Sequence, residues 1–150
     1  MFTVTLLEPQ IPPNTGNIAR LCAATNVKLE IVGNIGFKLT DRYLKRAGLD
    51  YWKHVNWEYF VSVEEYIDQL DKTKIHLLTT KSKVNYMDKT FSPGDHIIFG
   101  SETKGINEKY LNQYASRCCT IPMENPGVRS LNLSSSTAIV LFEAIRQNRN

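Results

Sequence analysis

The chain has 150 residues, of which 42% are hydrophobic and 22% charged, the composition of a soluble globular protein. Its 18 basic and 15 acidic residues leave a net charge of +3, which is compatible with an RNA or phosphate partner without indicating one. The pattern excludes a transmembrane helix, because no apolar run approaches the roughly 20 residues that one needs. The start carries no signal leader, so we expect one cytoplasmic domain over residues 1–150.

The first half of the chain alternates β-rich runs with small-residue or polar segments. We expect a strand at residues 2–7, a helix at 18–24 capped by Asn14 or Thr15, a strand at 28–32, and a short basic helix at 42–47 capped by Thr40 or Asp41.

The second half continues the alternation. We expect a strand at residues 56–60, a helix from the capping box at 62–65 to about residue 70, strands at 75–80 and 96–99, a helix at 108–114 capped by Asn107, a strand at 118–121, and a long helix at 133–146.

Strands that alternate with helices predict an α/β fold with a mainly parallel sheet. Ligands of such sheets lie beyond the carboxyl ends of the strands. Unusual loops follow three of these ends, after Thr80, Phe99 and Ile121. We therefore expect the ligand pocket in the second half of the chain.

Residues 121–142 combine a polar loop with an unusually apolar helix. The loop holds a turn signal at residues 125–127, and hydroxyl residues stand at the mouth of the helix. Residues 138–142 are then five apolar residues in a row, so apolar side chains cover every face of the helix instead of one stripe. One face can pack on the sheet, and the other needs a second partner.

Familiar cofactor motifs are absent from the sequence. The glycine spacing of residues 100–105 fits a phosphate-binding loop, but Ile106 and Asn107 stand where its lysine and serine or threonine belong. Histidines and cysteines have no metal-ligand spacing, so we expect no metal. His76 is interpreted as structural, and the cysteines (Cys22, Cys118 and Cys119) as buried and reduced.

A scattered set of polar residues remains: Asn14, Arg20, Glu102, Ser130 and Asn132. Each has an ordinary interpretation. The asparagines and the serine are also typical helix caps, Arg20 could form an exposed salt bridge of little energetic value, and Glu102 could be a solvated loop charge.

Taken together, these residues lie in three motifs that resemble the SPOUT superfamily of RNA methyltransferases, in its SpoU branch. The motifs are residues 14–20, residues 97–105, and residues 121–123 with 129–134; segments 8–17 and 46–51 narrow the resemblance to enzymes that methylate the tRNA wobble nucleotide. The resemblance implies 2′-O-methylation of cytidine or uridine 34, in tRNAs of the leucine type. The alternatives are methylation of ribosomal RNA or another tRNA position, and a non-catalytic RNA-binding relative.

The same resemblance implies a deep C-terminal trefoil knot and S-adenosylmethionine as the methyl donor. The implied donor-binding residues are Leu78, Thr79, Gly100, Glu102, Gly105, Ile121, Met123, Ser130 and Leu131. It also implies a homodimer with the active site at the subunit interface, in agreement with the apolar residues 138–142. We therefore expect that Leu141→Glu would separate the subunits.

The implied catalytic set is Arg20, Ser130, Asn132, Asn14 and Glu102. Arg20 would act from the partner subunit, Ser130 and Asn132 would position the ribose hydroxyl, and Glu102 would hold Arg20 or its neighbours. The tRNA anticodon arm would contact basic and aromatic side chains. The candidates are Lys38, Arg42, Lys45, Arg46, Lys81, Lys83 and Lys104, with Tyr43, Tyr51 and Trp52 for stacking on bases.

Overall fold

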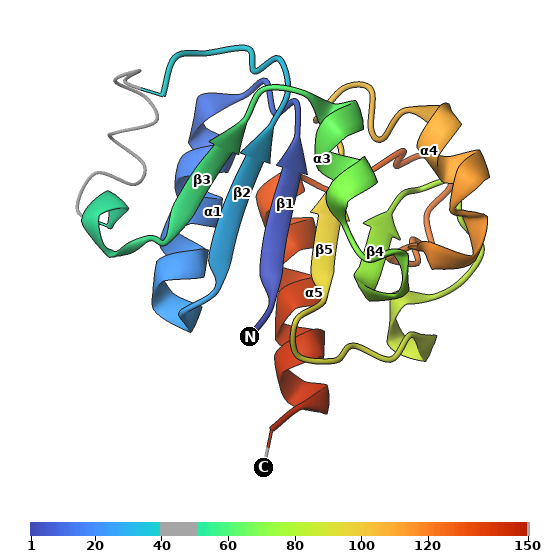
Figure 1. Ribbon diagram of the computed structural model, residues 1–150. Helices are drawn as coiled ribbons and strands as arrows, with labels where there is room; N and C mark the ends of the chain where they lie inside the picture. The colour runs from blue at the N-terminus through green and yellow to red at the C-terminus, as the bar shows by residue number, and fades with distance from the viewer. Residues whose placement is uncertain (40–50, 150) are drawn as a thin grey trace.

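The structure, a computed structural model, describes residues 1–39 and 51–149. Within these residues six strands form one sheet in the order β3-β2-β1-β5-β4-β6, and every pairing is parallel (Figure 1). The strands are β1 (Thr3–Leu7), β2 (Lys28–Val32), β3 (Trp57–Phe60), β4 (Ile75–Leu78), β5 (His96–Phe99) and β6 (Cys118–Cys119). The predicted α/β fold with a parallel sheet is confirmed.

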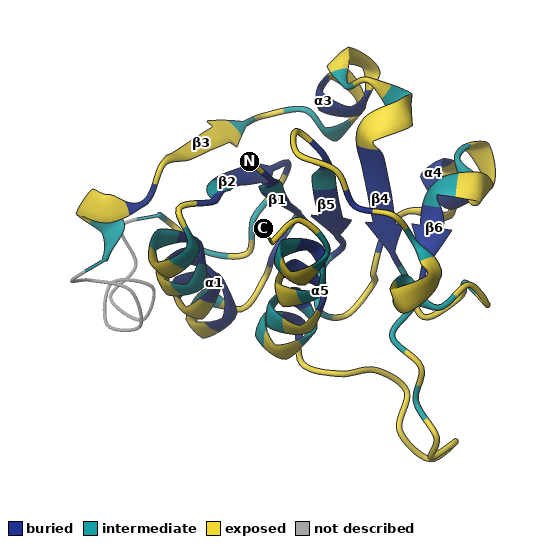
Figure 2. Ribbon diagram, turned by 90° about the horizontal axis from the view of Figure 1, so that it is seen from below, coloured by how far each residue is buried: buried dark blue, intermediate teal, exposed yellow. Residues whose placement is uncertain are grey.

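Helices cover both faces of this sheet. They are α1 (Pro12–Thr25), α3 (Val63–Gln69), α4 (Glu108–Gln113) and α5 (Leu133–Gln147). Figure 2 shows α1 and α5 side by side on one face, with α3 and α4 on the other. Short 3₁₀ turns complete the described chain: η1 (Trp52–His54), η2 (Lys72–Lys74), η3 (Tyr86–Asp88) and η4 (Ala115–Arg117). None of the described helices is long and apolar enough to cross a membrane.

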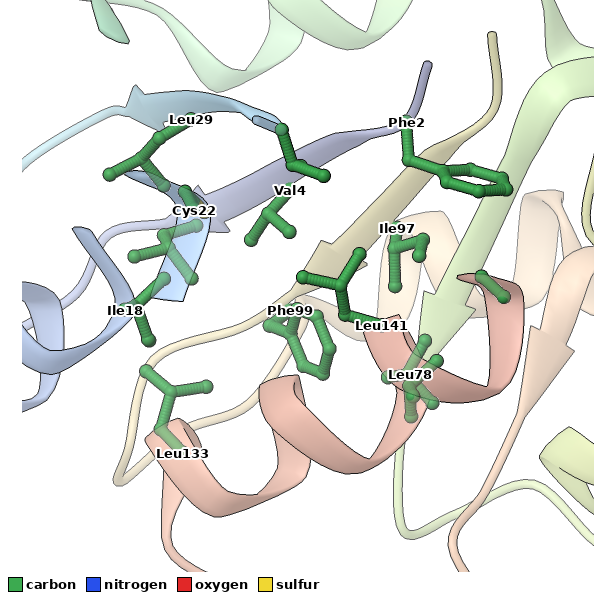
Figure 3. Packing of buried hydrophobic residues seen from close by; sticks show 14 of the residues in the cluster. Phe2, Val4, Ile18, Cys22, Leu29, Leu78, Ile97, Phe99, Leu133 and Leu141 are labelled. Atoms are coloured by element: carbon green, nitrogen blue, oxygen red, sulfur yellow. The ribbon is translucent and has the colours of Figure 1, made fainter. Parts of the chain in front are cut away.

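The hydrophobic core consists of two clusters, one on each face of the sheet. In the larger cluster Ile18 of α1 and Leu141 of α5 pack with Val4 and Ile97 of the central strands (Figure 3). In the smaller cluster, residues of α3 and α4 pack against the other face of the sheet, where Leu7 of β1 and Ile98 of β5 lie. Burial of each such side chain contributes about 1.5–3 kcal/mol, so α1 and α5 are fixed on the sheet by many small terms.

Most predicted elements are confirmed, with differences at their ends. The strands at residues 28–32 and 96–99 match β2 and β5 in full, whereas β4 and β6 are shorter than expected. Ser62 and Asn107 accept backbone hydrogen bonds at the starts of α3 and α4, as predicted. The helix predicted at residues 42–47 lies outside the described residues, together with Tyr43.

The start of α1 was predicted wrongly. The helix begins at Pro12, with Ile11 as its N-cap, so neither Asn14 nor Thr15 caps it. Proline suits the first helical turn because the N–H that it lacks would have no partner there. Asn14 is consequently a buried residue inside the first turn, and its side chain is available for contacts with other elements.

The apolar helix α5 has two kinds of apolar side chain. Val140, Leu141 and Ala144 are fully buried in the core of their own chain, whereas Ile139 and Phe142 are 37% and 53% exposed. The expectation that Leu141 lies on a second surface is therefore wrong. A charge at this position would disrupt the core, and the exposed large apolar side chains of α5 are Ile139 and Phe142.

The cysteines and His76 have the structural roles predicted for them. All three cysteines are free and buried, and burial raises the pKa values of Cys22 and Cys119 to about 12. His76 is 4% exposed; its Nε2 lies 2.8 Å from the carboxylate of Asp95, and its ring packs on Phe91.

Candidate functional site

The loops that follow β4, β5 and β6 meet the start of α5 around one cavity of about 470 Å³. All nine residues expected to bind the donor line this cavity: Leu78, Thr79, Gly100, Glu102, Gly105, Ile121, Met123, Ser130 and Leu131. The cavity lies where the ligand pocket is predicted, beyond the carboxyl ends of the strands. The first half of the chain also contributes, through Ile11 and Asn14.

The loop after β5 is tightly folded around Gly100. A Cβ atom on Gly100 would lie 2.0 Å from the carbonyl carbon of Gly105, so only glycine allows this approach. The loop closes through a hydrogen bond from the Gly105 N–H to the Ser101 carbonyl, 3.0 Å long, and Gly105 has φ +66°. The resulting turn forms one wall of the cavity.

The segment after β6 contributes three apolar side chains to the cavity, Ile121, Met123 and Leu131, beside polar ones such as Ser130. It is anchored at Thr120, whose N–H donates to the Val84 carbonyl at 2.8 Å. The predicted turn at residues 125–127 is present, because the Val128 N–H donates to the Asn125 carbonyl.

Glu102 connects the loop after β5 to the start of α1. Its carboxylate accepts hydrogen bonds from the backbone N–H groups of Gln10 (2.8 Å) and Ile11 (2.9 Å), and from the side-chain amide of Asn14 (3.1 Å). Negative charge at a helix N-terminus is favourable because it lies near unpaired N–H groups. Glu102 therefore holds the start of α1, and its hydrogen bonds do not reach Arg20.

Asn132 extends this connection to α5. Its Oδ1 caps the helix by accepting from the N–H groups of Ser134 and Ser135, while its Nδ2 donates to Asn14 Oδ1 at 3.1 Å. Asn14 is 6% exposed and uses both ends of its amide, one toward Asn132 and one toward Glu102. A continuous hydrogen-bonded chain thus joins the three sequence motifs beside the cavity.

Arg20 lies apart from this chain of contacts. It is exposed on α1 and lines a shallow groove between α1 and α5 together with Leu21, Ala24 and Ala138. Its guanidinium carbon lies 4.9 Å from the centroid of the Tyr51 ring. Of the five predicted catalytic residues, the structure brings Asn14, Glu102, Ser130 and Asn132 to the cavity, and it places Arg20 on a neighbouring surface.

One feature of the site has no signal in the sequence. Gln10 and Ile11 bind Glu102 through their backbone, which no residue type can reveal. At the rim, Lys81 forms an ion pair with Glu108, so its charge is partly neutralised, while Lys104 and Arg129 also line the cavity. Across residues 1–39 and 51–149, no cluster of histidine, cysteine or carboxylate side chains could hold a metal ion.

Comparison with known proteins agrees with this geometry. The chain matches the SpoU rRNA methylase family over residues 1–142. A tRNA (cytidine(34)-2′-O)-methyltransferase of Burkholderia pseudomallei is 42% identical, over 98% of this chain and 96% of the relative. A Methylovorus glucosotrophus protein of the same name is 43% identical, over 99% of this chain and 96% of its own.

Solved structures give the same result. One, described as concerning the 2-OH methylation of C/U34 on tRNA, superposes with a TM-score of 0.92 at 35% identity and covers 99% of this chain and 96% of its own. AviRb, a SpoU methyltransferase from Streptomyces viridochromogenes, shares the fold with a TM-score of 0.81 at 23% identity, over 98% of this chain and 59% of its own. The family match, the sequence relatives and the solved structures each cover nearly the whole chain. The chain therefore belongs to the SpoU rRNA methylase family.

Proposed function

We propose that this protein, as one domain in the cytoplasm, methylates the ribose 2′-hydroxyl of the tRNA wobble nucleotide, cytidine or uridine 34. Two relatives that are 42% and 43% identical to this chain, over nearly their whole length, carry names that describe this reaction at cytidine 34. The observation that carries the proposal is the convergence of Asn14, Glu102, Ser130 and Asn132 from three separate motifs on one cavity.

The proposed methyl donor is S-adenosylmethionine, which supplies a methyl group on a positively charged sulfur when it is bound. The cavity volume lies within the roughly 300–1,000 Å³ of small-molecule sites. Leu78, Ile121, Met123 and Leu131 offer apolar walls for a flat ring. The backbone N–H groups of Ile121 and Leu131 donate no hydrogen bond to any described residue, so they can serve the polar edge of such a ring. These residues fit the donor.

The reaction requires that the hydroxyl be oriented and lose its proton as it attacks. In this proposal Ser130 and Asn132, which line the cavity, orient the hydroxyl by hydrogen bonds. Arg20 is too basic to act as an ordinary base, since a guanidinium keeps its proton at all physiological pH values. Its role is to stabilise the negative charge that develops on the oxygen and to bind the adjacent phosphate.

The position of Arg20 supports a homodimer in which each Arg20 serves the partner's cavity. In one chain the guanidinium lies on the groove between α1 and α5, outside the cavity. The outward-facing Ile139 and Phe142 are on α5, which forms one wall of that groove. A second chain that covers this apolar surface would bring its own cavity toward Arg20.

We infer further that the chain is knotted, with the segment after β6 threaded through the segment after β4. Hydrogen bonds between these segments support the inference. Thr120, just after β6, is hydrogen-bonded to Val84 and Tyr86 in the segment after β4. Gln147 of α5 accepts a hydrogen bond from the Phe91 N–H, near the end of that segment. Pulling the two termini apart with optical tweezers tests this inference. A knotted chain stops short of the full contour length of 150 residues, and a chain that reaches it is unknotted.

The test of the function is methylation of an unmodified tRNA transcript with isotopically labelled S-adenosylmethionine. The product should carry one 2′-O-methyl group at nucleotide 34, which protects that linkage from alkaline hydrolysis and is mapped by mass spectrometry. A transcript with 2′-deoxyribose at position 34 is the control and should accept no label. Label at another position, or in ribosomal RNA only, would support the alternative substrates, and binding without label would support a non-catalytic protein.

A further inference from the structure

The Arg20 guanidinium lies over the ring of Tyr51, an aromatic residue outside the predicted catalytic set. The guanidinium carbon lies 4.9 Å from the centroid of the Tyr51 ring, within the roughly 6 Å over which a cation is attracted to a ring face. Arg20 is exposed, whereas Tyr51 is partly buried. The ring is thus the fixed partner and the guanidinium the group that it restrains.

Tyr51 is itself fixed by the turn that follows it. Its carbonyl accepts a 2.8 Å hydrogen bond from the His54 N–H, which closes η1. Trp52, the next residue, packs against the larger core cluster and meets Trp57 of β3 edge-on, with ring centroids 5.4 Å apart. The turn η1 also contacts α1 directly, so the helix that carries Arg20 and the ring that restrains it are parts of one packed unit.

An aromatic partner suits an arginine that must act on a substrate. A carboxylate partner would neutralise the charge and occupy N–H donors, whereas the face of a ring attracts the cation and takes none of the five donors. Arginine has much rotamer freedom, and charge stabilisation is effective only when the group is oriented before the reaction.

We propose that Tyr51 is a positioning residue, which holds the Arg20 guanidinium in the orientation that it uses on the ribose hydroxyl or adjacent phosphate. This inference rests on the proposed function. It assigns Tyr51 a different task from the base stacking expected from the sequence, because Arg20 covers one face of the ring.

Two variants of similar volume separate the ring face from simple packing. Tyr51→Phe keeps the aromatic face, and kcat should stay within about twofold of wild type. Tyr51→Leu keeps only apolar bulk, and kcat should fall about 5- to 30-fold, the value of one partly desolvated cation–π contact. The KM for S-adenosylmethionine should not change in either variant. Tyr114→Leu is the matched control, because it removes a similar cation–ring pair on the side of the sheet that α4 covers. There the Lys72 Nζ lies 5.8 Å from the centroid of the Tyr114 ring.

A spectroscopic measurement tests the contact without activity. In NMR spectra the side-chain protons of Arg20 should carry a ring-current shift that Tyr51→Phe retains and Tyr51→Leu removes. Wild-type kcat in Tyr51→Leu, or an equal loss in Tyr51→Phe, would overturn the inference, as would the absence of a ring-current shift in wild type. If the wild-type protein does not methylate tRNA at all, the proposed function fails first, and the NMR result still decides whether Tyr51 restrains Arg20.

Discussion

At the scale of single residues, one group of side chains fixes the geometry of the site, and Arg20 supplies the charge proposed to act on the substrate. Glu102 makes three hydrogen bonds to the start of α1, and Asn14 passes this restraint on to Asn132. Hydrogen bonds to a charged group are worth about 1.5–3 kcal/mol each, more than enough to hold a helix end in place. Ser130 and Arg20 of the predicted catalytic set take no part in these hydrogen bonds, and of the two only Ser130 lines the cavity.

Arg20→Ala should therefore remove catalysis and leave the donor site intact. We expect kcat to fall about 10²- to 10³-fold, the range for removing a donor that stabilises developing negative charge, with the Kd for S-adenosylmethionine within twofold of wild type. Single-turnover methylation and isothermal calorimetry measure the two values. Arg117→Ala, which alters an arginine of η4 outside the site, is the control. Wild-type turnover in Arg20→Ala would remove Arg20 from the mechanism.

One buried histidine, His76, and one partly buried histidine, His96, should make stability depend on pH. Burial lowers the pKa values of His76 and His96, although Asp95 and Glu30 oppose this shift and Lys28 adds to it for His96. The unfolded chain then binds more protons below its histidine pKa of about 6.5, so the free energy of unfolding falls as the pH drops below that value.

Urea denaturation at pH 7.5 and pH 5.5 measures this loss. His96→Gln should reduce the difference between the two pH values, because one of the shifted groups is gone. His54→Gln, at an exposed histidine of η1, should leave the difference unchanged. An unchanged pH dependence in His96→Gln would show that His96 does not contribute.

At the scale of elements, two helices begin with an asparagine cap but only one of these caps belongs to the site. Asn132 caps α5 and also binds Asn14, whereas Asn107 caps α4 alone. Asn107→Ala and Asn132→Ala should each lower the free energy of unfolding by about 0.5–2 kcal/mol.

Only Asn132→Ala should also lower kcat, by 10-fold or more, because it releases Asn14 and the positioning group at the cavity. Urea denaturation and methylation kinetics on both variants give the comparison. Equal activities would reduce Asn132 to a structural cap.

The elements also show how far the sequence could predict the structure. The strands β2 and β5 follow from local β-rich composition, and the caps of α3 and α4 follow from local chemistry. The predicted cap of α1, Asn14 or Thr15, lies three or four residues beyond the observed cap, Ile11. Proline in the first turn is a local signal for the earlier start, whereas the contact of Asn14 with Glu102, 88 residues away, follows from no local rule. The family resemblance supplied the set of site residues, but only the packing revealed that Arg20 meets Tyr51.

At the scale of the whole molecule, the outward side of α5 provides a test of the dimer. Phe142→Glu should give a monomer without methyltransferase activity, since it puts a charge on the surface that a second chain would bury. Light scattering after size-exclusion chromatography gives the mass, to be compared with 17.1 kDa for one chain. Val61→Glu, at a residue that is 78% exposed, is the control and should remain dimeric. An active Phe142→Glu monomer would contradict the proposed role of the interface.

The strand order has a consequence for the chain as it is translated. β1 lies in the middle of the sheet, but its neighbour β5 is made about 90 residues later, which takes roughly 5–20 s on a ribosome. Over that time the backbone N–H and C=O groups on one edge of β1 lack their strand partner, and α5, which covers the same core, has yet to emerge. The topology that builds the cavity therefore also leaves one side of β1 unpaired until late in synthesis.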